Sequence, residues 1–424
     1  KNTSIDMDFS ENKINLIIVG DYSFKDDYDK FNFQISKNKN DFIFNSNLEI
    51  ISSPVVINNI NYKKKENDFS EVTLKGIFFE NKNILFENIS LSEQKNNFYL
   101  SNLYLSDKYK IINFKEIKVK YLNDDKKLNQ LNIFKNKNII KLSSNTFDGK
   151  SVIKNLLKGD PNNNFLRVFK NLNSKIILNF DHVFINDDDY LKKINGSLDI
   201  KKNKIKYGNI SAKLEDKFDV NINIESNSKN EKVTNLIIDK PAPFIKYYKF
   251  IKGFNEGKLS YKSTEKNGLA KSNLKIFDFK VKEVPVLAKI LTLASLQGIA
   301  DLLTGEGIRF DDFEMDYETS KNSTNIKEMY AIGPAISILM SGYIEKNKLT
   351  SLRGTLVPAT TINKTIAKIP LIGELLVGKK AGEGIFGVSF KIKGPPKDLK
   401  TTVNPIKTLT PRFITRTLEK LKKN

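Results

Sequence analysis

The sequence predicts a mainly β fold built around a long antiparallel sheet, with a few short helices. Hydrophobic residues make up 39% of the chain, and Ile, Leu, Phe and Tyr dominate them while Trp is absent. Branched and aromatic side chains of this kind favour strands. In residues 1–140, strand-length apolar runs are separated by short clusters of Asn, Lys, Asp and Ser, which favour turns. Without intervening helical patterns, such neighbouring strands are expected to pair as a meander.

Within many runs the apolar and polar residues alternate. Phe218, Val220, Ile222 and Ile224 share one parity, and the residues between them are Asp or Asn. Leu85, Ile89 and Leu91 also share a parity. A period of two places such sets on one face of a sheet. Alternation by itself favours a closed core, because an apolar sheet face usually packs against another layer.

We count roughly twenty strand-like runs, whereas an open sheet rarely exceeds about ten strands without curling or splitting. The sheet must therefore twist strongly, close, or fold into a trough. Short helices are expected near residues 147–157, 164–171 and 241–250. Asp148 or Ser151 could cap the first of them.

Changes in residue composition divide the chain into three expected regions. The first, 1–160, is a β-meander, and the second, 161–270, continues the sheet with a short helix. The third, 271–424, is richer in Gly, Pro and long apolar stretches, with helices expected at 284–303, 358–377 and about 405–421.

The formal net charge is +21, with Lys and Asn spread along the whole chain. An anionic partner is one interpretation. The even spread favours the alternative that Lys and Asn merely fill solvent positions, and no basic patch with interleaved aromatic residues indicates nucleic acid.

The sequence offers little for catalysis. The chain has no cysteine and a single histidine, His182, which alternation places beside Phe180 and Phe184. Asp187, Asp188 and Asp189 lack the Gly and Glu spacing of a calcium loop, so they are expected to form a solvated turn. We therefore expect no enzymatic activity and no catalytic residue, cofactor or metal site.

The run Val284–Leu303 is the longest apolar segment, but Lys289 and Asp301 interrupt it. A spanning helix needs about 20 mostly apolar residues without central charges. A buried or interfacial helix is expected instead, which would cap the sheet or contact a membrane through Leu287, Ile290, Leu291 and Leu293.

The C-terminal third carries a specific set of motifs between residues 270 and 415. They are Val284–Gly298, Leu302–Phe310, Arg353–Ala359, Asn363, Ile369–Gly373, Gly382–Phe386, Phe390, Gly394–Pro395 and Val403–Pro405. In order and spacing these resemble the C-terminal region of the AsmA-like family (related to TamB), in its YhdP-type branch from proteobacteria. Lys407 and Arg412 depart from the pattern, since smaller residues are expected there. Upstream the resemblance is looser, and residues 1–150 share only the general pattern of strand-like runs, without matching motifs.

The resemblance implies structural roles for the motif residues Pro285, Gly298, Gly305, Gly307, Pro358, Asn363, Pro370, Gly373, Gly384, Asn404 and Pro405. It implies a strongly curved sheet that forms an elongated groove or trough with an apolar floor. It also implies a periplasmic protein, held in the inner membrane of a Gram-negative envelope by an N-terminal segment absent from this chain. Such proteins are thought to let phospholipid pass between the inner and outer membranes and to maintain the outer membrane.

Two functions follow as alternatives. In the first, the chain is a non-enzymatic lipid-handling protein whose groove binds phospholipid acyl chains, with Phe218, Val220, Ile222 and Ile224 as candidate groove residues. In the second, the sheet is a scaffold that recruits envelope proteins by strand addition at an open edge. Neither function involves nucleic acid.

Overall fold

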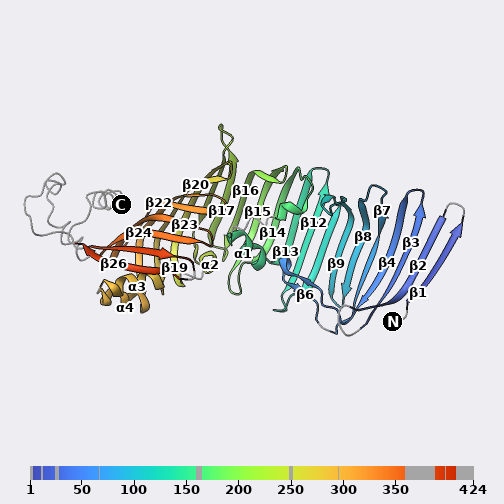
Figure 1. Cartoon of the computed structure of the whole chain (residues 1–424), viewed down its shortest axis with the longest axis horizontal. Coiled ribbons are helices and arrows are strands. Elements are labelled where there is room, and N and C mark those ends of the chain that lie inside the picture. Colours follow the sequence, from blue (N-terminus) through green and yellow to red (C-terminus); the bar gives the residue numbers. More distant parts are fainter. Residues whose placement is uncertain are drawn as a thin grey trace, which may run out of the picture. The chain divides into compact units, whose positions relative to one another are not determined.

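The computed structural model describes residues 3–10, 13–23, 28–65, 67–158, 165–247, 252–294, 296–358, 387–396 and 398–406. The predicted mainly β fold is confirmed (Figure 1). The chain forms two compact units, Lys1–Lys217 (unit 1) and Phe218–Asn424 (unit 2). The region boundaries expected from composition, near residues 160 and 270, both fall inside a unit. Strand pairing continues past each of them.

Unit 1 is a row of strands that lie side by side (Figure 1). They are β1 (Thr3–Ser10), β2 (Lys13–Tyr22), β3 (Asp29–Asn38), β4 (Asp41–Ile50), β5 (Val56–Ile57), β6 (Tyr62–Lys63), β7 (Ser70–Phe78), β8 (Ile84–Glu93), β9 (Asn96–Leu105), β10 (Ile111–Asn113), β11 (Glu116–Leu122), β12 (Leu128–Asn136), β13 (Ile139–Asp148), β14 (Ser174–Phe184), β15 (Tyr190–Lys201) and β16 (Lys204–Leu214). The small hairpin β5–β6 pairs apart from this row.

The expected antiparallel meander holds from β1 to β13, and β13 then pairs in parallel with β14. A parallel pair needs a crossover connection, and here it contains helix α1 (Lys150–Lys158) and the 3-10 helix η3 (Phe165–Val168). The predicted helix at 147–157 begins three residues later than expected, because Phe147 and Asp148 still belong to β13. The Asp148 carboxylate accepts the backbone N–H of Lys150 at 3.1 Å, as expected for a cap.

Unit 2 is a second meander, in which each strand pairs antiparallel with the next along the chain. Its strands are β17 (Phe218–Ser226), β18 (Lys232–Ile238), β19 (Lys252–Lys266), β20 (Leu269–Lys282), β21 (Ile308–Thr319), β22 (Ser323–Ile332), β23 (Ile336–Glu345), β24 (Leu349–Pro358), β25 (Gly387–Gly394) and β26 (Lys400–Ile406). Its helices are α2 (Ala242–Ile245), α3 (Pro285–Leu293) and α4 (Gln297–Thr304).

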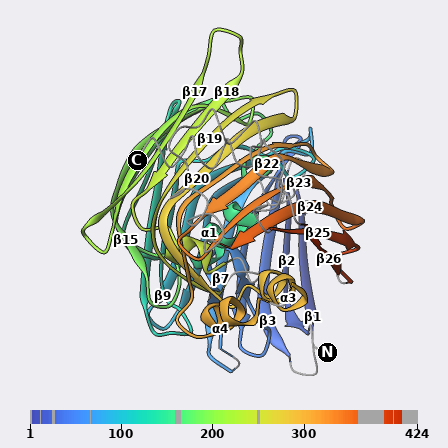
Figure 2. The same ribbon diagram turned by 90° about the vertical axis from the view of Figure 1, so that its left-hand side faces the viewer.

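The single helix expected at 284–303 was wrong, because the structure has two helices there. The backbone of Leu296 lies outside the helical region, and its carbonyl accepts the N–H groups of Ile299 and Ala300, which starts α4. Figure 2 shows α3 and α4 beside each other. The break lets both helices contribute to one core, since Leu291 and Ala300 are both buried in it.

This core covers one face of the unit 2 sheet. Besides α2, α3 and α4, it takes buried side chains from β20 to β25, among them Ile276, Phe310, Ile336, Leu356 and Phe390. The apolar alternation of these strands is therefore satisfied by the chain's own helices.

The helix expected at about 405–421 was wrong for its first residues, since Asn404 and Pro405 lie in β26. Pro405 is tolerated there because, among the described strands, β26 pairs only with β25, so one side of it forms no ladder. Pro358 ends β24, and the rest of the helix expected at 358–377 lies outside the described residues, as do Asn363, Pro370, Gly373 and Gly384.

Other motif residues are placed as the sequence suggested. Pro285 is at the first turn of α3, Gly298 lies in α4, and Gly305 follows the last residue of α4. Gly307 has φ +90°, and a Cβ there would lie 2.8 Å from the carbonyl oxygen of Val281. Only glycine suits this turn from α4 into β21.

The core of unit 2 gives a direct test of this arrangement. Leu291 is 0% exposed, whereas Leu293 in the same helix is 51% exposed. We expect Leu291→Ala to lower the free energy of unfolding of unit 2 by about 2–5 kcal/mol, because it leaves a cavity. Leu293→Ala is the matched control and should change it by less than about 0.5 kcal/mol. Chemical denaturation of both variants measures this, and equal effects would contradict the packing described.

Candidate functional site: an apolar row across unit 1

The most extended feature of unit 1 is a line of directly paired, mostly apolar residues that crosses the strands. We call it the central row. It consists of Ile5, Ile18, Phe33, Ser46, Leu74, Ile89, Leu100, Ile117, Ile133, Leu142, Leu178, Gly196 and Ile210. Paired residues share a face of the sheet, and strands lie about 4.8 Å apart, so the row is about 58 Å long.

Two further rows run beside the central row on the same face. One joins Met7, Leu16, Ile35, Phe44, Gly76, Phe86 and Leu103. The other joins Gly20, Phe31, Leu48, Val72, Leu91, Phe98, Val119 and Leu131. The opposite face of the same strands carries mostly polar residues, such as Asn45 and Asn47 on β4 and Lys118 and Lys120 on β11.

The prediction that Leu85 shares a face with Ile89 and Leu91 was wrong. Leu85 pairs with Ile77 and so points away from Ile89 and Leu91. The cause is a β-bulge, in which Glu87 is an extra residue between Phe86, which pairs with Gly76, and Asn88. The bulge brings Phe86 onto the apolar face, where its ring lies 5.6 Å from that of Phe44.

The apolar side chains of the central row are only partly covered by the rest of the chain. Each of its apolar side chains keeps part of its surface exposed, and Ile5 is 63% exposed. Among the described residues of β1 to β4, no apolar side chain is buried. The core of unit 2 differs, since Leu291, Ile336 and Leu356 there are 0% exposed. The apolar face at β1 to β4 is therefore not sealed by the protein's own atoms.

One margin of the apolar face is covered by the segment 51–65 that connects β4 to the β5–β6 hairpin and beyond, which we call the strap. Tyr62 of the strap is buried against Phe98 and Tyr121, with ring centroids 4.5 and 5.5 Å away. Its hydroxyl donates to the Glu93 carboxylate at 2.6 Å. Burial, then the Glu93 carboxylate, raises the pKa of the Tyr62 hydroxyl, so it stays a hydrogen-bond donor.

The strap is fixed at its start by Asp29. The carboxylate of this residue accepts the backbone N–H groups of Ile51, Ser52 and Ser53 at 2.8, 3.1 and 3.3 Å. Burial alone would raise the pKa of Asp29, but these hydrogen bonds outweigh it and hold the pKa below its ordinary value. The charged form of Asp29 therefore stabilises the strap.

The opposite margin is covered by η3 and the residues around it. Leu166 and Leu172 are buried against Phe114, Ile140 and Ile176. These contacts lie where β13 and β14 begin and β15 ends, whereas the strap lies where β9 begins and β11 ends. From β1 to β9 the central row runs clear of these clusters. From β11 to β16 its residues pack against the second cluster, namely Ile117, Ile133, Leu142, Leu178 and Ile210.

The four candidate groove residues of β17 share a face, as alternation predicted. Val220 is buried, and Phe218, Ile222 and Ile224 are half-buried. In register, Val220 pairs with Ile238 and Ile222 with Leu236, so the apolar face continues onto β18.

The candidate membrane-contact residues of α3 are not all available for such contact. Leu287, Ile290 and Leu291 are buried in the core of unit 2, and only Leu293 is exposed. These three residues cap the sheet, because α3 is apolar around most of its circumference and therefore needs cover on several sides.

In the part of the chain that the structure describes, no helix is long and apolar enough to span a membrane.

His182 is packed, as expected, between Tyr190 and Phe184, with ring centroids 4.3 and 4.7 Å away. Burial, then the charge of Lys192, lowers its pKa. Asp187 pairs with Lys150 at 2.7 Å, and Asp189 bonds within its own turn. No group of side chains suited to a metal ion occurs among the described residues.

Sequence reasoning identified the face on β17 but missed the longer row of unit 1. The signal was present in each strand as apolar alternation. What could not be read was the register that joins one strand to the next, because turns and bulges set it.

Comparison of the chain with protein-family models, with curated proteins and with solved structures finds no match to any of them. The assignment of function therefore rests on the residues and their arrangement.

The anchor of the strap gives a pH-dependent prediction. A carboxyl whose pKa is lower in the folded state contributes stability above its unfolded pKa, and loses this contribution as the pH falls through the folded value. Asp29→Asn should therefore destabilise unit 1 at pH 7, and the difference from wild type should shrink below about pH 4. Thermal melts at both pH values measure it, with the exposed Asp6→Asn on β1 as control. A difference that is independent of pH would contradict the role of the Asp29 charge.

Proposed function

We propose that this chain is a non-enzymatic lipid-handling protein that binds phospholipid acyl chains along the central row of unit 1. The observation that carries the proposal is the incomplete covering of this row, which is clearest at β1 to β4, where no apolar side chain with a described burial is buried. A folded protein normally covers such a surface, and a large exposed apolar patch marks a place where something else binds.

The energetics favour an acyl chain as the occupant. Each methylene that leaves water gains about 0.8 kcal/mol, so roughly sixteen methylenes gain on the order of 12 kcal/mol. These contacts are non-directional. A bound chain can therefore slide from Phe33 to Leu74 to Leu100 without breaking hydrogen bonds, which suits transport better than a fixed site would.

In this proposal the face forms the floor of a curved trough, with the strap as one wall and η3 with its neighbours as the other. Tyr62 and Leu166 close the two margins through apolar contacts. The acyl chain lies along the central row, and the head group stays in water at the open side. The residues Phe218, Val220, Ile222 and Ile224 offer a shorter surface of the same kind on β17.

The cellular setting is proposed from the C-terminal motifs. Their resemblance to the AsmA-like family supports a periplasmic protein that is attached to the inner membrane and passes phospholipid toward the outer membrane. The buried Leu287, Ile290 and Leu291 support a capping role for α3 rather than membrane contact. Leu293 is the residue of that set that could meet a lipid surface.

A second candidate function is a scaffold that recruits envelope proteins. Among the described strands, β1 pairs only with β2, so its outer edge offers backbone groups for strand addition. Ile5 and Met7 on this strand are 63% and 48% exposed, and an added strand would cover them. A partner protein captured by the chain in place of lipid would support this alternative.

The two faces of β2 and β4 provide a test of lipid binding. Ile18→Asp combined with Phe44→Asp places two charges on the apolar face. Val19→Asp combined with Ile43→Asp places the same charges at adjacent positions on the opposite face, where both residues are exposed. The purified proteins are incubated with vesicles of phosphatidylethanolamine and phosphatidylglycerol that contain a fluorescent long-chain phospholipid, and the lipid bound to protein is measured.

The wild-type chain and the opposite-face variant should bind lipid, and the apolar-face variant should bind at least about tenfold less, because each buried charge costs more than the methylene contacts regain. Circular dichroism shows whether all three proteins are folded. Equal lipid binding by the two variants, or none by the folded wild-type chain, would rule out the acyl-chain function.

A further inference from the structure

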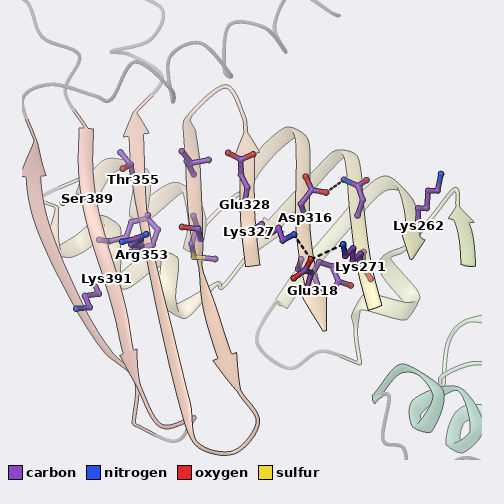
Figure 3. A pocket seen from close by; sticks show the side chains of 18 of the residues that line it. Lys262, Lys271, Asp316, Glu318, Lys327, Glu328, Arg353, Thr355, Ser389 and Lys391 are labelled. Atoms are coloured by element: carbon purple, nitrogen blue, oxygen red, sulfur yellow. Dashed lines mark hydrogen bonds and ion pairs between the residues drawn. The ribbon is translucent and has the colours of Figure 1, made fainter. Parts of the chain in front are cut away.

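Unit 2 contains a hollow of about 1020 Å³ that is lined mainly by residues of the face opposite its core. It spans β19 to β26, and its labelled side chains are charged or hydroxylated (Figure 3). Leu352 and Ile392 pack in the core, so Arg353 and Lys391, which alternate with them, point to the other face and line the hollow. Phe390 and Met340 from the core side also contribute to its lining.

On one side of the hollow most of the charges are paired. Glu318 pairs with Lys327 at 2.6 Å and with Lys271 at 3.9 Å. The side-chain amide of Asn273 donates to Asp316 at 2.7 Å. These pairs appear as dashed lines in Figure 3. The carboxylates on this side of the hollow are therefore already neutralised by neighbouring lysines or hydrogen-bonded.

On the other side, two positive charges have no counter-charge among the described residues. Arg353 of β24 and Lys391 of β25 are directly paired in register. Among the residues that the structure describes, no carboxylate lies within ion-pair distance of either. Elsewhere on this face, lysines meet carboxylates across strands, as Lys258 does with Asp239 and Lys275 with Glu314.

Like charges directly opposite each other destabilise a sheet. Nothing in the fold requires this pair, since both side chains are exposed and lie away from the core. An anion bound between them would remove the repulsion and gain two charge-assisted hydrogen-bonding partners.

The surroundings of the pair are suited to an oxyanion. The hydroxyl groups of Ser341, Thr355 and Thr402 and the amide of Asn404 line the same part of the hollow, whereas the Ser389 hydroxyl donates to the backbone carbonyl of Asn404. Ser341 pairs with Arg353 in register, and Thr402 pairs with Lys391. A guanidinium offers a planar fork that matches the oxygens of a phosphate group, and hydroxyl and amide donors complete its hydrogen bonds.

We propose that the hollow binds a phosphate group between Arg353 and Lys391. The phosphate can come from a lipid head group or from a soluble phosphate ester, since both present the same oxygens. The proposal is independent of acyl-chain binding, because it concerns other residues, on the polar face of unit 2.

The experiment uses two hollow variants, Arg353→Gln and Lys391→Gln, and a matched control, Lys393→Gln. Lys393 lies two residues further along β25, on the same face and exposed, but outside the hollow. Inorganic phosphate is titrated against a chloride control of equal ionic strength, with the melting temperature as readout. Sedimentation with phosphatidylglycerol vesicles tests the lipid head group.

Phosphate should raise the melting temperature of the wild type and of Lys393→Gln, and each hollow variant should bind about tenfold or more weakly. Vesicle binding that is lost in the same two variants identifies a lipid head group. Phosphate binding without vesicle binding identifies a soluble ester. In phosphate-free buffer, Arg353→Gln should be at least as stable as the wild type, because the repulsion is gone. An equal response of wild type and hollow variants to both probes would overturn the proposal.

Discussion

The structure of unit 1 depends on strand register. Each strand alternates apolar and polar residues, and a shift of one residue between neighbouring strands would turn every apolar side chain to the other face. Because pairing keeps Ile18 opposite Phe33 and Leu74 opposite Ile89, the apolar residues form continuous rows. The bulge at Glu87 shows how strict this constraint is, since it absorbs an extra residue and keeps Phe86 on the apolar face. Gly76 makes room for the bulge, because a Cβ there would lie 2.1 Å from the carbonyl oxygen of Leu85.

The same alternation has two different outcomes in the two units. In unit 2 the apolar face is covered by helices that are themselves apolar on most sides, and the result is a filled core around Leu291. In unit 1 the strap and η3 cover the margins, and they leave the middle of the face least covered at β1 to β4. The strap is held by polar contacts, through Asp29 to the backbone and Tyr62 to Glu93, so its position does not require a complete apolar layer beneath it.

The sequence was sufficient to predict most strands, most of the meander and the faces of strands without bulges, because these depend on a local period of two. The face of Phe218, Val220, Ile222 and Ile224 is an example. It was insufficient where distant residues decide. The break between α3 and α4 cannot be read from a run that is apolar throughout, and the burial of Leu287 depends on strands up to a hundred residues away. The pairing of Arg353 with Lys391 likewise required the register of β24 and β25.

The central claim is that the apolar middle of unit 1 receives acyl chains. Photo-crosslinking with a phospholipid that carries a diazirine on its acyl chain, followed by mass spectrometry of the labelled peptides, tests it most directly. The account predicts labels on residues of the central row, such as Phe33, Leu74 and Leu100. Labels confined to the opposite face, at residues such as Ile17 and Ile43, or an absence of labels from unit 1, would contradict it.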